Sequence, residues 1–538
     1  MIMRLGNFNH IARHWKGLAA ATMLAGVAAT AVPAEAKTLV IARDMDINSL
    51  DIDRSWCDTC MIYNAAVYDG LLALDKDNKL VPVIAESWTV NDDQTVFTFK
   101  LNPKATFSDG SKIEAKDVKW SWERLKNIKG SPSDLASTIS SIETPDAETV
   151  VAKTAEPNSE LLNVLAASYF GVINSDVAQA EGKATAAADA AQSDPAEPWF
   201  LAHSAGAGPF VLDSYQPGAE LRLKRNEKYW REPAKVDEIV IRQVGDAVAQ
   251  AQLLQSGQAD VAMNIDPETA KTLTGPNVKT ESAPSNNFVY IAISPGAVAN
   301  PFPMTADIRE AISLAVDRKS LVDFTLGEGN GRLISVPFPL DFPGGAGHSI
   351  PEFDQAKAKE LLAKAGHADG FTLEATYPKL NVYGVDFTLA MQKIQQDLAA
   401  VNIKLDLKPV EFPNWREAAN KDHIPLTFVF FAPDFYGTSQ YVNYFGLAPD
   451  STWAKRAGAA TDPSFVINDT KPMLAEALKS APDKAEKIYF DIGEKIKAQN
   501  VIIPMISPNT ILAYGSKVHG VRNSPSSNVP LYEISLDD

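Results

Sequence analysis

Cysteine is almost absent from this sequence: the 538 residues include only two, Cys57 and Cys60. Because there is no second pair, a zinc site made of four cysteines is excluded. Met61 follows Cys60, so the pair is not a haem-attachment motif of the Cys-x-x-Cys-His kind. Two states remain open, a local disulfide and a redox-active dithiol of the thioredoxin kind. In an oxidising compartment we expect the disulfide.

Histidine is also scarce, and its spacing does not suit a metal site. Five of the seven histidines follow residue 36, and none of these five stands in a His-x-His or His-x3-His pattern. We therefore expect surface or turn histidines, no resident metal ion and no cofactor. A metal held by an organic chelator needs few protein ligands and stays possible. The five are His203, His348, His367, His423 and His519.

The sequence lacks an excess of positive charge and lacks the common catalytic signatures. It has 50 Lys and Arg against 67 Asp and Glu, a net charge of −17, which argues against binding nucleic acid or anionic membranes and suits the attraction of cations. Neither Gly-x-Ser-x-Gly nor His-Glu-x-x-His occurs. We expect a protein that is not an enzyme; a secreted hydrolase acting on a small peptide-like substrate is the alternative.

The first 36 residues have the three parts of a secretory signal. Arg4, Arg13 and Lys16 precede an apolar, Ala-rich run over 17–32, and small residues end at Ala36. The alternative, a membrane anchor, would need roughly 20 apolar residues, which is more than this run supplies. We therefore expect cleavage after Ala36 and a soluble periplasmic protein, long enough for two or three domains.

One stretch combines a buried strand with a single acid. Leu426–Phe431 is a run of apolar residues that predicts a strand buried on both faces, ended by a loop containing Pro433 and Gly437. Asp434 lies in that loop, beside Phe435 and Tyr436. A carboxylate with aromatic neighbours at the carboxyl end of a strand suits a cationic ligand. The alternative is that Asp434 only caps the following helix.

Hydrophobic periodicity predicts further elements. A strand, a helix and a strand over 371–407 predict a mostly parallel sheet of the α/β class. The segment 80–88 reads as a loop, and the Ala-rich segment 178–196 as a surface helix or loop at a domain border. Strands are predicted at 38–43, 95–101, 288–293, 371–377 and 403–407, and helices at 113–125, 308–316 and 386–400.

Six short motifs follow one another along the sequence. They are Gly206-Ala207-Gly208-Pro209-Phe210, Arg225–Trp230, Ser256–Asp260, Ile308–Ile312, Ala315–Arg318 and Ala356–Gly366. Each motif alone is weak, but together, in their order and spacing, they resemble those of the extracytoplasmic solute-binding proteins of ABC importers, in the subfamily of peptide and nickel binders (solute-binding family 5).

The resemblance implies an α/β fold with two lobes, mixed sheets, a hinge of two crossovers and an extra domain inserted in the first lobe. It also implies a monomeric receptor that delivers its ligand to an ABC permease at the inner membrane. The expected divisions are the signal peptide 1–36, lobe I at 37–80, 205–290 and 504–538, the inserted domain 81–204, and lobe II at 291–503.

The same resemblance implies a role for Asp434, because peptide-binding relatives place an Asp there to take the ligand's amino group. We expect Phe435, Tyr436, Trp56 and Tyr383 to be the other ligand-binding residues. Dipeptide binders also carry an Arg just ahead of the helix that here begins near Asp386. This chain has Val385, Phe387 and Thr388 instead. We therefore expect the capture of a longer peptide or another amine-bearing solute.

Overall fold

The computed structural model describes residues 36–421 and 423–537. The expected secretory signal, apart from Ala36, lies outside these residues, so its cleavage stays a prediction. Within the described ranges, none of the helices is both long and apolar enough to cross a membrane.

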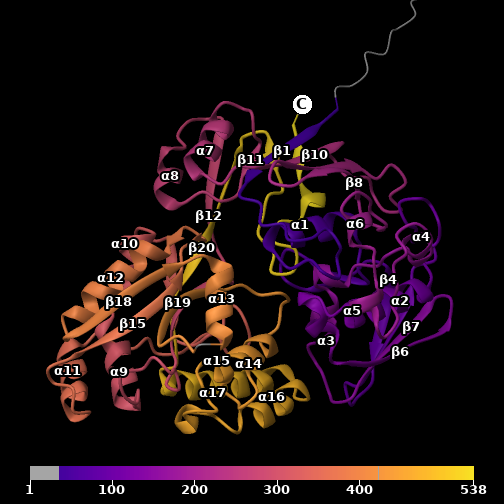
Figure 1. Cartoon of the computed structure of the whole chain (residues 1–538). Helices are drawn as coiled ribbons and strands as arrows, with labels where there is room; N and C mark the ends of the chain where they lie inside the picture. Colours follow the sequence, from indigo (N-terminus) through magenta and orange to yellow (C-terminus); the bar gives the residue numbers. More distant parts are fainter. Residues whose placement is uncertain (1–35, 422, 538) are drawn as a thin grey trace, which may run out of the picture. The chain divides into compact units, whose positions relative to one another are not determined.

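The largest sheet has twelve strands and mixes parallel and antiparallel pairs (Figure 1). Ten of them follow the order β18-β15-β19-β13-β20-β11-β1-β10-β9-β8, and β12 and β14 also pair with β20. The strands are β1 Thr38–Arg43, β8 Phe210–Gln216, β9 Glu220–Arg225, β10 Glu238–Gln243, β11 Val261–Ala262, β12 Val278–Pro284, β13 Phe288–Ile293, β14 Gly331–Leu333, β15 Phe371–Pro378, β18 Ile403–Val410, β19 Leu426–Phe431 and β20 Ile502–Gly515.

β20 joins the two halves of this sheet. Its last seven residues pair antiparallel with β12, and its first residues pair antiparallel with β13. The register shifts between Val289 and Tyr290, where Pro504 of β20 lies opposite Tyr290. Proline cannot donate a ladder hydrogen bond, which explains an irregularity at this point. The chain thus crosses between the halves twice, once through β12 and β13 and once through β20.

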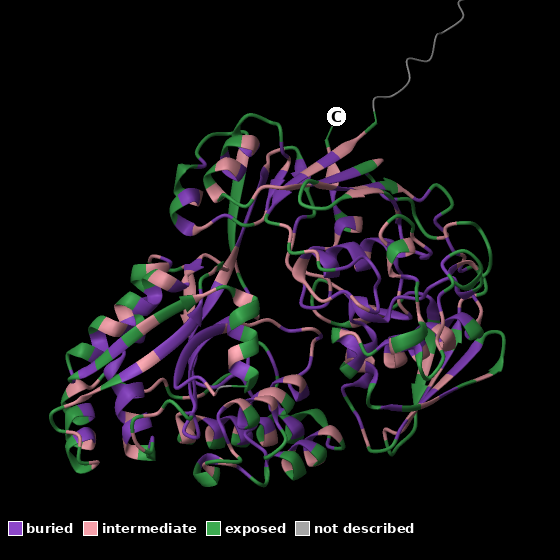
Figure 2. Cartoon of the chain, viewed as in Figure 1, coloured by how far each residue is buried: buried purple, intermediate pink, exposed green. Residues whose placement is uncertain are grey.

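Each half has its own buried core (Figure 2). In one, β1 runs parallel to β10 and β11 and is covered by α1. In the other, β15 and β18 are parallel and α12 connects them, which confirms the strand, helix and strand prediction. Helices of these halves are α1 Asp58–Val67, α7 Ala247–Gln255, α8 Pro267–Thr272, α9 Ala306–Ala315, α10 Arg318–Thr325, α11 Gln355–Lys364, α12 Phe387–Ala399, α13 Phe412–Lys421, α14 Ser439–Phe445, α15 Thr452–Arg456, α16 Thr470–Leu478 and α17 Pro482–Gln499.

A separate antiparallel sheet, in the order β4-β5-β7-β6, packs against α2. The segment 80–88, expected to be a loop, contributes β3 and the start of β4. β4 is mostly exposed, pairs only with β5 and is irregular near Ser87, so its sequence shows no clear alternation. The remaining elements are β2 Leu72–Leu74, β3 Leu80–Pro82, β4 Ala85–Val90, β5 Val96–Leu101, β6 Ile139–Asp146, β7 Thr149–Thr154, β16 Asn381–Val382, β17 Val385–Asp386, β21 Val518–His519, β22 Ser535–Leu536, α2 Ala115–Ile128, α3 Leu161–Leu165, α4 Ser175–Ala180, α5 Ala190–Ser193 and α6 Glu197–Phe200.

A buried ion cluster ties α2 to the loop before α1. Arg124 on α2 donates from Nη1 to Asp53 at 2.6 Å, from Nη2 to Asp51 at 2.6 Å and from Nε to Asp194 at 3.1 Å. All four side chains are fully or almost fully buried. Asp194 belongs to the segment 178–196, so the expectation of a mere surface segment was wrong at this residue. The composition of this segment gave no sign that the Asp194 carboxylate is buried, because its partner, Arg124, lies far away in the sequence.

The balance of charge in this cluster accounts for part of the raised pKa of Asp53. Arg54 also bonds Asp51 and Asp194, so two guanidinium groups face three carboxylates. Burial raises the pKa of Asp53 to about 7, opposed by the charge of Arg124 and reinforced by that of Asp51. A proton on Asp53 would leave two positive and two negative groups.

Replacing Arg124 by Met should strongly destabilise the fold, because it leaves buried carboxylates without their main counter-charge. Removing one partner of a buried ion pair typically costs about 3–5 kcal/mol. Urea unfolding should show this loss, and Lys119→Met should change stability by less than about 0.5 kcal/mol, since Lys119 lies on the same helix in an exposed pair with Glu123. Equal effects of the two variants would contradict this account.

Candidate functional site

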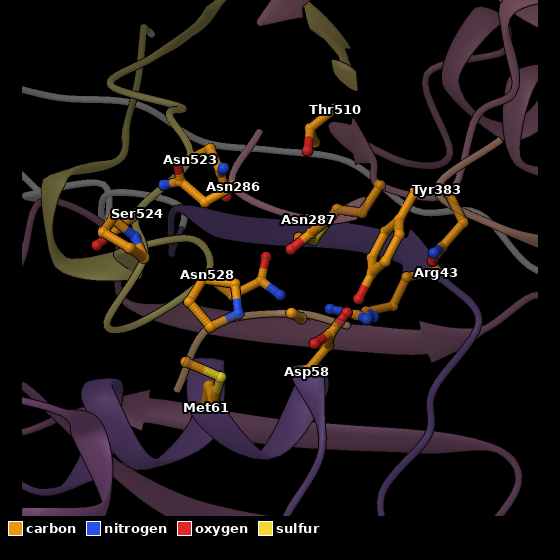
Figure 3. Close-up of a pocket in the computed structure, with 15 residues that line it drawn as sticks. Arg43, Asp58, Met61, Asn286, Asn287, Tyr383, Thr510, Asn523, Ser524 and Asn528 are labelled. Carbon is orange, nitrogen blue, oxygen red and sulfur yellow. The ribbon is translucent and has the colours of Figure 1, made fainter. Parts of the chain in front are cut away.

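A cavity of about 70 Å³ lies where several chain segments meet beside the two crossovers (Figure 3). Its walls come from the end of β1, the first two turns of α1, the junction of β12 and β13, β20, the turn between β16 and β17, the residues after β19 and the stretch 523–528. Both halves of the large sheet therefore contribute to it.

The first turn of α1 presents Asp58 to this cavity. Cys57 is the N-cap of α1 and accepts a hydrogen bond on Sγ from the Cys60 N–H at 2.9 Å. A disulfide joins Cys57 to Cys60, as expected. Asp46 accepts from the N–H groups of Asp58 and Thr59, both at 2.9 Å. These contacts fix the backbone on both sides of Asp58.

Asp58 is an electrostatically costly acid at that position. Burial, followed by the charge of Asp46, raises its pKa to about 6. Arg43 and a hydrogen bond from Asn528 act in the opposite direction and offset only part of the rise. A helix N-terminus favours negative charge, but here that benefit does not cancel the desolvation of the carboxylate. A cation in the cavity would stabilise the ionised form.

Asp434 lies three residues beyond β19, in a loop shaped by Gln440. The Asp434 N–H donates to Gln440 Oε1 at 2.9 Å, and Gln440 Nε2 donates to the carbonyls of Phe435 and Gly437 at 2.6 and 2.9 Å. The helix that follows, α14, has Thr438 as its N-cap. The capping alternative for Asp434 was therefore wrong, because the helix begins too far along the chain.

The Asp434 carboxylate makes no hydrogen bond or ion pair with any residue that the structure describes. Burial, followed by the charge of Asp58, raises its pKa well above the usual range. Asp434 itself is half-buried and does not line the cavity, whereas its neighbours Ala432 and Pro433 do. Asp434 and Asp58, from the two halves of the sheet, thus repel each other beside the cavity.

Tyr383 occupies the tip of the hairpin formed by β16 and β17. Tyr383 and Gly384 both have positive φ, +55° and +80°, as a two-residue type I′ turn requires. A tyrosine rarely adopts this conformation, so the hairpin holds it at some cost. Its ring packs edge-on against Phe430, with centroids 5.8 Å apart. Figure 3 shows the hydroxyl pointing toward Arg43 and Asp58.

The other three expected ligand-binding aromatics do not line the cavity. Trp56 stacks on Tyr169, with ring centroids 5.1 Å apart. Phe435 is buried in the core that covers the antiparallel sheet. Tyr436 packs against Phe342 and donates its hydroxyl to the Asp341 carbonyl at 3.0 Å. These rings brace the loops that carry Asp58 and Asp434, and a direct contact with ligand stays a prediction.

Arg43, the last residue of β1, is like Asp58 a charged lining residue that the sequence analysis did not predict for the site. Its side chain is buried, with 3% of the residue exposed. Nε donates to the Asp44 carbonyl at 3.2 Å, Nη2 lies 3.9 Å from Asp46 Oδ1, and Nη1 is buried with no acceptor. The available signal was a charged residue at the carboxyl end of a predicted strand.

Neutral amides complete the cavity. Asn286 and Asn287 follow β12, and Asn523 lies in the return of the chain after β21. Their side-chain amides hydrogen bond to no other residue in the described parts of the chain. An amide both donates and accepts, so these groups match the N–H and C=O of a peptide or a similar polar solute.

None of the five histidines that the structure describes lines the cavity, and all five have protein contacts elsewhere. His348, for example, bonds Glu494 and stacks on Phe490. Across residues 36–421 and 423–537 there is no group of three His, Cys, Asp or Glu side chains placed to hold a metal ion.

Comparison with known proteins agrees with this architecture. The family described as "Bacterial extracellular solute-binding proteins, family 5 Middle" matches residues 79–453. The chain is similar to the glutathione-binding protein GsiB of Salmonella paratyphi A, with 29% identity over 533 residues, 97% of this chain and 98% of that protein. It is also similar to a dipeptide-binding protein of Pseudomonas aeruginosa, with 26% identity over 482 residues, 85% and 86% of the two chains.

Solved structures show the same fold. DppA from Helicobacter pylori, in complex with the peptide STSA, superposes with a TM-score of 0.77 at 20% identity and covers 93% of this chain and 98% of its own. NikA from Brucella suis, in complex with Fe(III)-EDTA, gives a TM-score of 0.76 at 20% identity, with 93% and 100% covered. The chain therefore belongs to family 5 of the bacterial extracellular solute-binding proteins, a family of binding proteins and not of enzymes.

Proposed function

We propose that this protein is the periplasmic component of an ABC importer and that it captures a peptide or another amine-bearing solute between two lobes. The relatives support the class of solute, because they include a dipeptide-binding protein, a glutathione-binding protein and a protein in complex with the peptide STSA. The protein would then hand its ligand to a membrane permease. The expected cleavage after Ala36 and the monomeric state belong to this proposal.

In this proposal the lobes follow the expected divisions, with lobe I at 37–80, 205–290 and 504–538, the inserted domain at 81–204 and lobe II at 291–503. The two crossovers support these borders. β12 and β13 are separated only by 285–287, and β20 pairs with both. The antiparallel sheet with α2 accounts for the inserted domain. Asp58 then belongs to lobe I, and Asp434 and Tyr383 belong to lobe II.

The observation that carries the proposal is the meeting of two carboxylates that the protein does not neutralise. Asp58 and Asp434 come from different lobes, the charge of Asp58 helps to raise the pKa of Asp434, and neither carboxylate has an ion pair with a lysine or arginine of the described chain. A cation between them would relieve both the repulsion and the desolvation. It would favour the arrangement in which the lobes meet, as a closing receptor requires.

Aromatic rings surround the same position. Burial is the largest cause of the raised pKa of Tyr441, and the charge of Asp434 is the second. The charge of Asp434 also helps to raise the pKa values of Tyr169 and Tyr383, for which burial is again the largest cause. Tyr169 belongs to the inserted domain and the other two to lobe II. Rings around a carboxylate favour an organic ammonium group, which gains a cation–π interaction and loses little hydration.

A second set of contacts between the parts supports closure. Glu160 in the inserted domain accepts hydrogen bonds from the N–H groups of Thr438 and Ser439, at 3.1 and 3.0 Å, and from the Tyr489 hydroxyl at 2.7 Å. A Cβ on Gly437 would lie 2.4 Å from Glu160 Oε2, so only glycine allows this approach. The loop that carries Asp434 is therefore also the loop that the inserted domain holds.

The size of the cavity supports a hinge. At about 70 Å³ it is well below the roughly 300–1,000 Å³ of ordinary ligand pockets. The lobes must therefore separate before a peptide can enter. The extent to which they close again should depend on the size of the solute. A ligand shifts such an equilibrium only by its different affinity for the two states.

Replacing Asp434 by Asn should weaken the binding of an amine-bearing solute about 30-fold to several thousand-fold, because the variant removes the charge and keeps the shape. This corresponds to about 2–5 kcal/mol for a buried charge pair that loses one partner. Calorimetric titration with peptides that the wild type retains from a pool of di- to tetrapeptides measures it. Asp369→Asn, at an exposed position of lobe II, is the matched control. A loss under about threefold would exclude Asp434 as the anchor.

The affinity for such a peptide should also fall as the pH drops through about 6. Asp58 and Asp434 have raised pKa values, so protonation removes the charges that attract the amine. Below its raised pKa each carboxyl that is ionised in the complex must release a proton on binding, and each makes affinity fall by about tenfold per pH unit. Titrations between about pH 7 and about pH 5 should show this slope. Asp58→Asn should remove the part of the slope that begins near pH 6 and leave the part due to Asp434; an unchanged slope in that variant would contradict the assignment.

Replacing Glu160 by Gln should shift the protein without peptide toward the open state. Gln places an N–H₂ group against three donors, so at least one of the hydrogen bonds to Thr438, Ser439 or Tyr489 is lost. Small-angle scattering should give a larger radius of gyration than for the wild type. Glu156→Gln, at an exposed position of the same segment, should leave it unchanged. The same profile for all three proteins would contradict a closing role for Glu160.

A further inference from the structure

Only two charged side chains line the cavity, and they have opposite signs. These are Arg43 from β1 and Asp58 from α1; the other lining residues are neutral. No ion pair joins Arg43 to Asp58, although both point into the cavity (Figure 3). Asn528 donates one hydrogen bond to Asp58, and the charge of Arg43 stabilises Asp58 only in part. A cavity that offers one positive and one negative group without an ion pair between them is complementary to a molecule that carries both charges.

Arg43 has hydrogen-bonding capacity that the protein does not use. Its Nε donates a hydrogen bond to the Asp44 carbonyl. Nη1 is buried without an acceptor, and Nη2 lies 3.9 Å from Asp46 Oδ1, which is too far for a hydrogen bond. A buried guanidinium donor without an acceptor is costly, since its hydration is lost and nothing replaces it. A carboxylate could occupy the two Nη groups side by side, which is the geometry that arginine provides and lysine does not.

The hairpin of lobe II supplies no positive charge to the cavity. The residues on either side of Asp386 are neutral: Val385, Phe387 and Thr388. Asp386 accepts from the N–H groups of Thr388 and Leu389 and so is engaged as the N-cap of α12. The hairpin contributes the neutral ring of Tyr383 to the cavity instead. Arg43, from the opposite lobe, is the remaining positive group there.

We propose that the solute is a zwitterion whose carboxylate is bound by Arg43, while its amine lies toward Asp58 and Asp434. This inference rests on the proposed function, which it extends from an amine to a solute with both charged ends, such as an unmodified peptide or an amino-acid conjugate. The amides of Asn286, Asn287 and Asn523 lie in the same cavity and suit the polar groups between the ends. Arg43 is then a residue that determines specificity.

The test compares three forms of one peptide set: unmodified di- to tetrapeptides, the same peptides as C-terminal amides, and the same peptides with an acetylated N-terminus. Calorimetric titration of the wild type should show the amides binding about 30-fold or more below the unmodified set, because the amide lacks the charge that Arg43 receives. This comparison needs no mutation, so it does not depend on the folding of a variant.

Arg43→Met should lower affinity for the unmodified peptides by a similar factor and leave affinity for the amides almost unchanged. Arg43→Lys should recover part of the loss, since it keeps the charge without the paired donors. Arg242→Met is the matched control: Arg242 pairs in register with Ala42, next to Arg43, and donates to the Gln258 carbonyl away from the cavity. It should bind all three forms as the wild type does.

The outcomes separate this inference from the proposal beneath it. If unmodified peptides and amides bind the wild type equally while the acetylated set is rejected, the amine receptor stands and the role of Arg43 is overturned. If Arg43→Met weakens both unmodified peptides and amides to the same extent, Arg43 is a structural residue and the inference is overturned. If none of the three forms binds, the proposed function fails and the inference fails with it.

Discussion

The strand β20 is the constraint on which the arrangement of the site depends. Because its fourteen residues pair with β12 at one end and with β13 at the other, the two crossovers are held side by side where the chain passes between the halves. Ser285, in the short link between β12 and β13, donates its hydroxyl to the Pro508 carbonyl at 2.5 Å and accepts from Ser507 on its own carbonyl at 3.2 Å. Asn286 and Asn287 therefore reach the cavity from a segment that is fixed on both sides.

Two groups of buried acids show how the same residue type can be structural or functional. Asp51, Asp53 and Asp194 surround Arg124, which bonds all three, so each of these carboxylates has a bonded counter-charge inside the protein. Asp58 and Asp434 have no ion pair of this kind with a described residue, and the charge of Asp58 helps to raise the pKa of Asp434. Natural proteins retain unmatched charge of this kind where a ligand supplies the counter-charge. The distinction lies in the partners of the acids and not in their degree of burial.

The sequence predicted regular elements well because hydrophobic periodicity is local information. β1 and β13 begin and end at the predicted residues, and α12 lies within its predicted range. The disulfide and the Asp434 loop also followed from local patterns. Arg43 was missed because its importance depends on which strand ends gather beside β20, a long-range property. The role of the aromatic residues was ambiguous for another reason. Trp56 and Phe435 are side chains of a kind that often stacks on ligands, yet here they pack against neighbouring parts of the protein.

In the proposed receptor, the loop between β19 and α14 would link recognition to closure. It carries Asp434 toward Asp58, and a few residues later its backbone N–H groups bind Glu160 of the inserted domain. Gln440 ties these two parts together, since it bonds the Asp434 N–H as well as the Phe435 and Gly437 carbonyls. A cation that stabilises Asp434 in place therefore also stabilises the backbone that Glu160 holds. Without the cation, the repulsion between the two acids opposes the Glu160 contacts, so the balance between open and closed states depends on the charge of the solute.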